Sequence, residues 1–92
     1  MSDTLTLRLK GEYFNAIKSG EKEFEYRLTT PYWTRRLKNR IYEEIAIIWG
    51  YPSREKTDLR IMRPYRGYTI QVITHPHFGP DPVEVFAIDV RP

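Results

Sequence analysis

The segment from Gly20 to Arg27, which has the sequence GEKEFEYR, carries five charged side chains in eight residues. Within it, Glu25 lies between two cations, Lys22 and Arg27. Nearby cations favour the ionised form of a carboxylate, which can then accept hydrogen bonds or a proton from a ligand. Lys22 and Arg27 can bind phosphate or carbonyl oxygens. We therefore take Lys22, Glu25 and Arg27 as candidate binding residues, and Lys22 and Glu25 as the candidate catalytic pair if the protein is an enzyme.

The same segment also has a purely structural interpretation. Residues 21–28 alternate as in a β-strand, so the charges can form an outer face that neutralises itself through cross-strand ion pairs. The position of the segment favours a functional role, because it begins where a helix should end and leads into a basic helix. The charges alone do not decide between the structural and the functional interpretation.

A basic block occupies the middle of the chain. Residues 33–66 carry nine basic and four acidic side chains, whereas residues 1–32 are balanced and residues 67–92 are slightly acidic. Such a block attracts phosphates whatever the nucleic-acid sequence, although a solvated basic surface has the same composition. Arginine dominates the basic residues, which favours bidentate phosphate contacts and stacking on bases. Besides the three residues above, the candidate nucleic-acid contacts are Tyr26, Arg35, Arg36, Tyr51, Arg63, Tyr65 and Arg66.

Aromatic residues beside these cations can stack on unpaired bases. Tyr51 and Tyr65 lie next to proline and arginine in expected loops, so they are the favoured stacking candidates. Trp33 and Trp49 lie in patterns that are more typical of core residues. The expected partner is RNA, single-stranded nucleic acid or a nucleotide-like small molecule.

The segment HPHFGPDP carries two histidines, His75 and His77, two residues apart. A zinc site would need further ligands, of which Asp81 is one candidate, and a proline-rich turn is the simpler interpretation. One histidine can instead serve as a general acid or base near neutral pH. The sequence has no P-loop, dinucleotide-binding fingerprint or serine nucleophile elbow. We expect no cofactor and no bound metal.

The elements that must position these residues follow from periodicity and capping signals. Leucines alternate in Thr4–Lys10, as in a half-buried strand, and residues 11–19 have helical spacing followed by a capping Gly20. Thr30 and Pro31 begin a second short helix within YWTRRLKNRIYEE. We expect an α+β fold with a small mixed or antiparallel, barrel-like sheet. The further expected strands are Glu21–Leu28, Ile45–Trp49, Leu59–Met62, Gly67–Thr74 and Val83–Val90.

Length and composition predict one domain over residues 1–92. The chain has no cysteine, which excludes disulfides and points to a reducing compartment. No signal peptide is visible, and the longest apolar run is too short to span a bilayer. We expect a cytoplasmic protein that does not interact with membranes.

The stretch LRLKGEYFNAIKSGEKEFEYRL resembles the opening of ASCH domains, which belong to the PUA-like superfamily. The family pattern is a leucine-rich strand, a helix of the form EYFxAIxxG and then G-x-K-x-x-E-x-R. Gly20, Lys22, Glu25 and Arg27 fill the last pattern. The resemblance implies a small PUA-like β-barrel of about five or six strands with two short helices. It also implies a cleft, lined by the motif residues, that binds RNA or a nucleotide-like ligand.

Related ASCH proteins act as ribonucleases or acetylcytidine amidohydrolases, and the amidohydrolase pattern resembles G-x-K-T-x-T-x-R. Glu23 and Glu25 occupy the two threonine positions here. Glu25 can be a general base or a hydrogen-bond acceptor, but it cannot be a threonine-type nucleophile. The leading hypothesis is therefore binding of RNA or a modified nucleoside. The alternatives are a hydrolase on the same scaffold and a protein-interaction module whose basic helix docks on an acidic partner.

Overall fold

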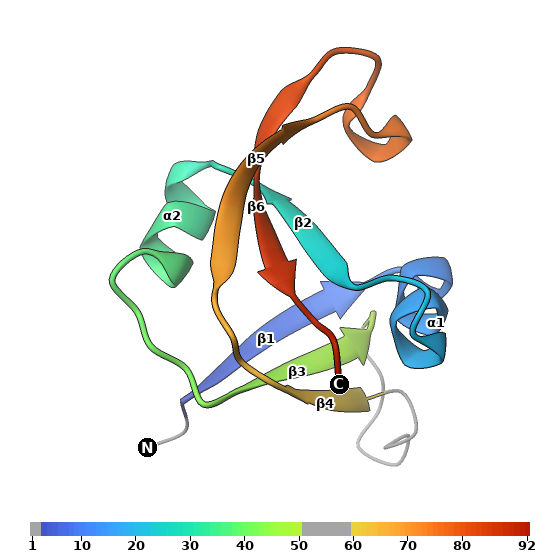
Figure 1. Cartoon of the computed structure of the whole chain (residues 1–92), viewed down its shortest axis with the longest axis vertical. Helices are drawn as coiled ribbons and strands as arrows, with labels where there is room; N and C mark the ends of the chain where they lie inside the picture. The colour runs from blue at the N-terminus through green and yellow to red at the C-terminus, as the bar shows by residue number, and fades with distance from the viewer. Residues whose placement is uncertain (1–2, 51–59) are drawn as a thin grey trace.

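The computed structural model describes residues 3–50 and 60–92, which form an α+β fold of six strands and two α-helices (Figure 1). The predicted fold class is confirmed at this level. Neither helix is long and apolar enough to cross a membrane. In chain order the elements are β1 (Thr4–Leu9), α1 (Gly11–Ser19), β2 (Phe24–Leu28), α2 (Pro31–Leu37), β3 (Glu44–Trp49), β4 (Arg60–Pro64), β5 (Tyr68–Ile73) and β6 (Val83–Asp89), with a 3-10 turn over Pro76–Phe78.

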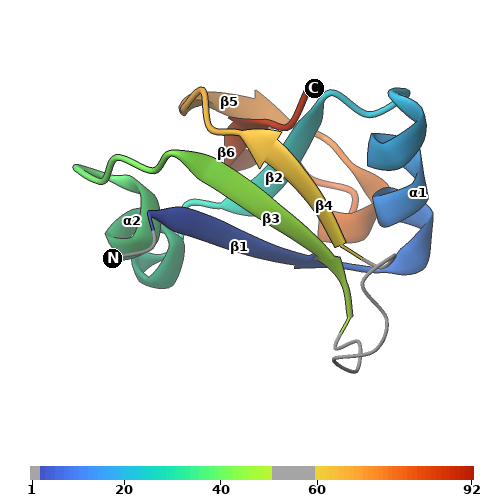
Figure 2. The same ribbon diagram turned by 90° about the horizontal axis from the view of Figure 1, so that it is seen from below.

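The strands form two three-stranded sheets, ordered β1-β3-β4 and β2-β6-β5 (Figure 2). β1 and β3 run parallel, and the other neighbouring strands run antiparallel. Among residues 3–50 and 60–92 no ladder joins the two sheets, so they do not close into one barrel. β1 and β2 are consequently edge strands, and their edges are available to form a site.

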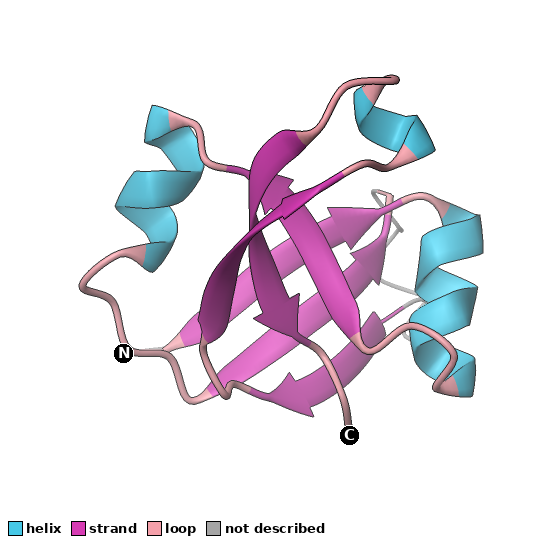
Figure 3. Ribbon diagram, turned by 45° about the horizontal axis from the view of Figure 1, so that its top comes forward, coloured by secondary structure: helices cyan, strands magenta, loops and turns pink. Residues whose placement is uncertain are grey.

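The core is made by the two sheets, α1 and Leu37 of α2. Leu5 and Leu7 of β1 are fully buried together with Ile88 of β6, as the alternation in TLTLRL predicts. Phe14 and Ile17 of α1 belong to the same cluster. Burial of each such side chain contributes roughly 1.5–3 kcal/mol to folding. The two helices lie at opposite ends of the pair of sheets (Figure 3).

The turn that follows α1 places Lys22 just before β2. Gly20 ends the helix in the left-handed conformation, with φ of +88°, which glycine adopts without strain. Its N–H donates to the carbonyl of Ile17, and the N–H of Lys22 donates to the carbonyl of Ala16 at 3.0 Å. The predicted cap is confirmed. β2 begins at Phe24, so Lys22 lies in the turn before the strand.

The start of α2 also follows the prediction. The hydroxyl of Thr30 accepts a hydrogen bond from the N–H of Trp33 at 3.3 Å, and Pro31 occupies the first turn. The helix uses only the first part of the expected segment and ends at the buried Leu37. Lys38 leaves the helical conformation with ψ of 131°, and Asn39 follows with a left-handed φ of 60°.

Candidate functional site

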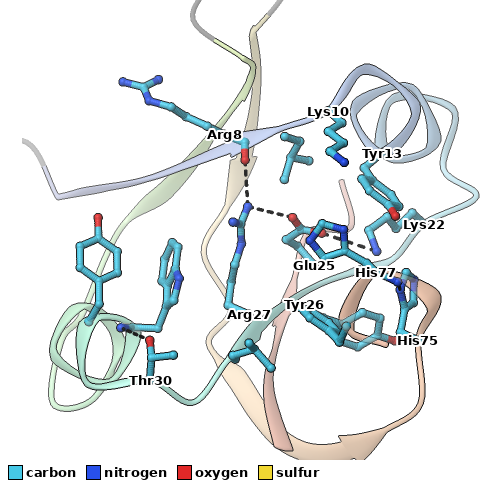
Figure 4. Close-up of a pocket in the computed structure, with 15 residues that line it drawn as sticks. Arg8, Lys10, Tyr13, Lys22, Glu25, Tyr26, Arg27, Thr30, His75 and His77 are labelled. Atoms are coloured by element: carbon cyan, nitrogen blue, oxygen red, sulfur yellow. Dashed lines mark hydrogen bonds and ion pairs between the residues drawn. The ribbon is translucent and has the colours of Figure 1, made fainter. Parts of the chain in front are cut away.

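A hollow of about 390 Å³ lies where β1, α1, β2 and α2 meet the turn around Pro76. Its walls come from segments far apart in the sequence, and Figure 4 shows that Lys22, Glu25 and Arg27 lie together there. The three residues that the sequence singled out in GEKEFEYR therefore all line the hollow, from β2 and the turn before it.

Glu25 links the two cations of the motif into a continuous chain of charges. Its Oε1 lies 3.5 Å from Nζ of Lys22, and its Oε2 accepts a 2.9 Å hydrogen bond from Nη2 of Arg27. The same Nη2 donates to the backbone carbonyl of Arg8 at 3.0 Å. Arg27 thus spans the gap between the edge strands β2 and β1 (Figure 4).

Glu25 is buried, with 7% of its surface exposed, although it lies on a strand whose neighbours Phe24 and Tyr26 are only half-buried. The segment therefore does not form an outer strand face throughout, although its charges do pair with one another and, through Glu23, with Arg91 after β6. A buried carboxylate is costly unless it is paired and hydrogen-bonded, and Lys22 and Arg27 supply both requirements. The arrangement fixes an anionic acceptor and a cationic donor beside each other on a regular strand.

Aromatic rings hold the two cations in place. Nζ of Lys22 lies 4.8 Å from the ring centre of Tyr26 and 5.5 Å from that of Tyr13. The guanidinium carbon of Arg27 lies 4.9 Å from the ring centre of Trp33. Cation–π contacts of this kind orient a charge while leaving some of its N–H groups for a ligand.

The two histidines reach the same hollow from the turn before β6. The backbone N–H of His77 donates to Nδ1 of His75 at 3.1 Å, so a neutral His75 carries its proton on Nε2. Both rings pack near Tyr13, with centroids about 6 Å away. No group of three potential metal-ligating side chains occurs in residues 3–50 and 60–92, so Asp81 does not complete a zinc site there.

Four of the predicted arginine contacts do not line the hollow: Arg36 lines only an adjoining one, and the other three lie elsewhere. Arg35 is exposed on α2. Arg63 donates to the backbone carbonyls of Val90, at 3.2 Å, and Ile17. Arg66 donates to the carbonyls of the last two residues, Arg91 and Pro92, at 2.9 and 2.7 Å. Arg63 and Arg66 thus tie the C-terminal segment to its surroundings, and a contact of these three residues with nucleic acid stays a prediction.

Of the two tyrosines that the sequence favoured for base stacking, the structure describes Tyr65. Tyr65 is half-buried against the core, where its ring meets that of Tyr42 edge-on at 5.3 Å. Burial raises its pKa, and the neighbouring tyrosines Tyr68 and Tyr42 raise it further. Tyr65 does not line the hollow. Tyr51 lies outside the described residues.

The hollow also contains residues that the sequence did not single out as ligand contacts. Tyr13 lies on α1, and Trp33 had the pattern of a core residue, yet both line the hollow. Phe78 joins them from the 3-10 turn. Trp33 also packs against the core, so the core interpretation was correct but incomplete. Lys22 and Arg27 come to lie next to these rings through tertiary packing, which the sequence pattern does not show.

No family model, no curated protein and no solved structure matches this chain. A function for the site is therefore argued from its geometry.

Proposed function

We propose that this protein binds RNA, or a modified nucleoside, in the hollow lined by Lys22, Glu25 and Arg27. The observation that carries the proposal is the buried Glu25 carboxylate with Lys22 and Arg27 on its two oxygens, at the wall of a hollow lined by aromatic rings. These residues fill the ASCH pattern G-x-K-x-x-E-x-R. We also propose that the two sheets are an open variant of the PUA-like barrel.

The chemistry of the wall is complementary to a nucleobase. The edge of a base presents carbonyl oxygens next to N–H groups, and the Lys22–Glu25 pair presents a donor next to an acceptor. The rings of Tyr13, Tyr26 and Phe78 offer surfaces on which a base can stack, at roughly 1–3 kcal/mol per base. A hollow of about 390 Å³ is within the size range of small-molecule sites.

An NMR titration of the isotope-labelled chain tests the proposal, with short RNA and DNA oligomers and free modified cytidines as ligands. The expected result is that the amide signals of residues 22–27 shift on addition of RNA or of a modified cytidine. Lys22→Met should lose the response, and Lys18→Met, which removes the same charge from an exposed position on α1, should keep it. Unchanged signals with every ligand would refute the proposal.

A hydrolase on the same scaffold is the second candidate, and one observation favours it. His75 and His77 line the same hollow as Glu25, so a carboxylate base and an imidazole acid are both present. In this mechanism Glu25 accepts a proton from water or a ribose hydroxyl, and Lys22 stabilises the developing oxyanion. Cleavage or deacylation that continues at the full rate in Glu25→Gln would exclude it.

A further inference from the structure

A second hollow, of about 430 Å³, adjoins the first on the side of α2. The two hollows share Arg27, Trp33 and two other lining residues. Within residues 3–50 and 60–92 no carboxylate lines the second hollow, in contrast to the first. One ligand can therefore extend from the mixed-charge hollow into a purely basic one. The lining residues of the second hollow are Thr6, Arg8, Arg27, Tyr32, Trp33 and Arg36.

Arg36 is the distinctive residue of this second hollow. Its guanidinium carbon lies 5.4 Å from the ring centres of both Tyr32 and Trp33, and Nη1 donates to the hydroxyl of Tyr32 at 3.2 Å. Its Nε is buried and has no hydrogen-bond partner within residues 3–50 and 60–92. In the described parts of the chain Arg36 forms no ion pair. The side chain is thus held in place by neutral rings while its charge is uncompensated.

Arg27 approaches the same indole ring, so two guanidinium groups lie around Trp33. Of these two groups, only Arg27 has a carboxylate partner among residues 3–50 and 60–92, and that partner, Glu25, lines the first hollow and not the second. Two cations near one ring repel each other, and because Glu25 pairs with Arg27 alone, a further anion beside Arg36 would reduce this repulsion. A tetrahedral phosphate supplies that anion, and its oxygens match the planar donors of arginine.

We propose that the second hollow, with Arg36 as its principal donor and Arg27 as its second, is a phosphate subsite. This inference rests on the proposed function and sharpens its ligand class. The base occupies the first hollow, and the phosphate of the same or the adjoining nucleotide occupies the second. The ligand is then a nucleotide or a nucleotide unit within a strand, and not a free nucleoside.

The test compares ribonucleosides, their 3′- and 5′-monophosphates and inorganic phosphate as NMR ligands of the full chain. We expect at least one monophosphate to bind about tenfold more tightly than its nucleoside, as one charge-assisted hydrogen bond allows. Arg36→Met should reduce this gain to less than about twofold, because the methionine keeps the stem and removes the donors. Arg60→Met removes the same charge from an exposed position on β4 and should keep the gain. Inorganic phosphate should shift the Nε–H signal of Arg36 more weakly than the monophosphate does.

Equal affinities of nucleosides and monophosphates, or a gain that persists in Arg36→Met, would overturn the phosphate subsite alone. If Arg36→Met does not fold, the Nε–H signal of Arg36 in the wild-type chain decides. A shift with the monophosphate and none with the nucleoside supports the subsite, and an unchanged signal contradicts it. Absence of binding by nucleosides, nucleotides and RNA oligomers alike would overturn the proposed function as well.

Discussion

The guanidinium nitrogen Nη2 of Arg27 lies 3.0 Å from the backbone carbonyl oxygen of Arg8, and this contact connects two edge strands that share no ladder. The same nitrogen holds the Glu25 carboxylate at 2.9 Å. One side chain therefore both bridges the two sheets and anchors the charged wall of the candidate site. Stability and ligand binding should be coupled at this residue.

Arg27→Lys should destabilise the fold although it keeps the positive charge. The ammonium of lysine ends nearer the backbone than Nη2 of arginine does, and it lacks the planar guanidinium that packs near Trp33. It therefore cannot keep both the bond to the Arg8 carbonyl and the bond to Glu25 in this geometry. We expect the free energy of unfolding to fall by about 1–3 kcal/mol, as for other charge-assisted hydrogen bonds. Chemical denaturation measures the change. Arg60→Lys, at an exposed position, is the matched control, and an equal effect of both substitutions would contradict the bridging role.

Glu25→Gln should destabilise the protein more than Glu23→Gln does. The neutral amide would leave Lys22 and Arg27 close together without their common anion, and removal of one partner from a buried ion pair costs up to about 3–5 kcal/mol. Glu23 is mostly exposed, and its ion pair with Arg91 is 3.9 Å long, so its loss should cost no more than about 1 kcal/mol. Thermal and denaturant unfolding of the two variants compare these losses directly. Similar values for both would show that the charge pairing of Glu25 contributes little.

Asp89 should make the fold sensitive to acid. Hydrogen bonds from the Arg91 side chain, the shorter at 2.7 Å, hold the pKa of Asp89 below its ordinary value, and the nearby Arg66 adds to this against the opposing effect of burial. A depressed folded-state pKa gives stability that is present above the unfolded-state pKa of about 3.9 and is lost as the pH falls through the folded-state value.

Asp89→Asn should therefore lower stability at neutral pH by about 1 kcal/mol, because Arg91 is half-exposed and its pairing is screened. The variant should also lose less stability than the wild type on acidification below the unfolded-state pKa. Unfolding curves recorded across the acid range measure both effects. Asp81→Asn, at an exposed position, serves as the control. A wild-type acid profile that matches that of Asp89→Asn would contradict the role of this carboxylate.

Local signals in the sequence predicted the elements well. Gly20 and Thr30 mark helix ends that the structure confirms, because capping depends on neighbouring residues only. The leucine alternation in β1 likewise predicted its buried face. The C-terminal end of α2 was harder to predict from the sequence. The segment YWTRRLKNRIYEE keeps helical spacing beyond Leu37, the side chain that anchors the helix to the core.

The site was predictable only in part. Lys22, Glu25 and Arg27 lie close together in the sequence, so one motif located all three. Trp33 and His75 come to the hollow through tertiary packing, which no local pattern reveals. Arg63 shows the converse limit. Its place in the basic block suggested contact with phosphate, but it did not reveal the contacts of this side chain within the fold. Its hydrogen bonds to the backbone carbonyls of Val90 and Ile17 depend on tertiary packing, and its contact with phosphate stays a prediction.

The most direct test of the central claim is the affinity for a short single-stranded RNA, measured at several salt concentrations for the wild type, Lys22→Met and Lys18→Met. The account predicts that the logarithm of affinity falls steeply with the logarithm of salt for the wild type and Lys18→Met. Lys22→Met should bind at least about tenfold more weakly, as expected for a charged hydrogen-bond donor, while keeping its fold. Binding that is absent, independent of salt or equal in Lys22→Met and Lys18→Met would contradict the assignment of this hollow as the RNA site.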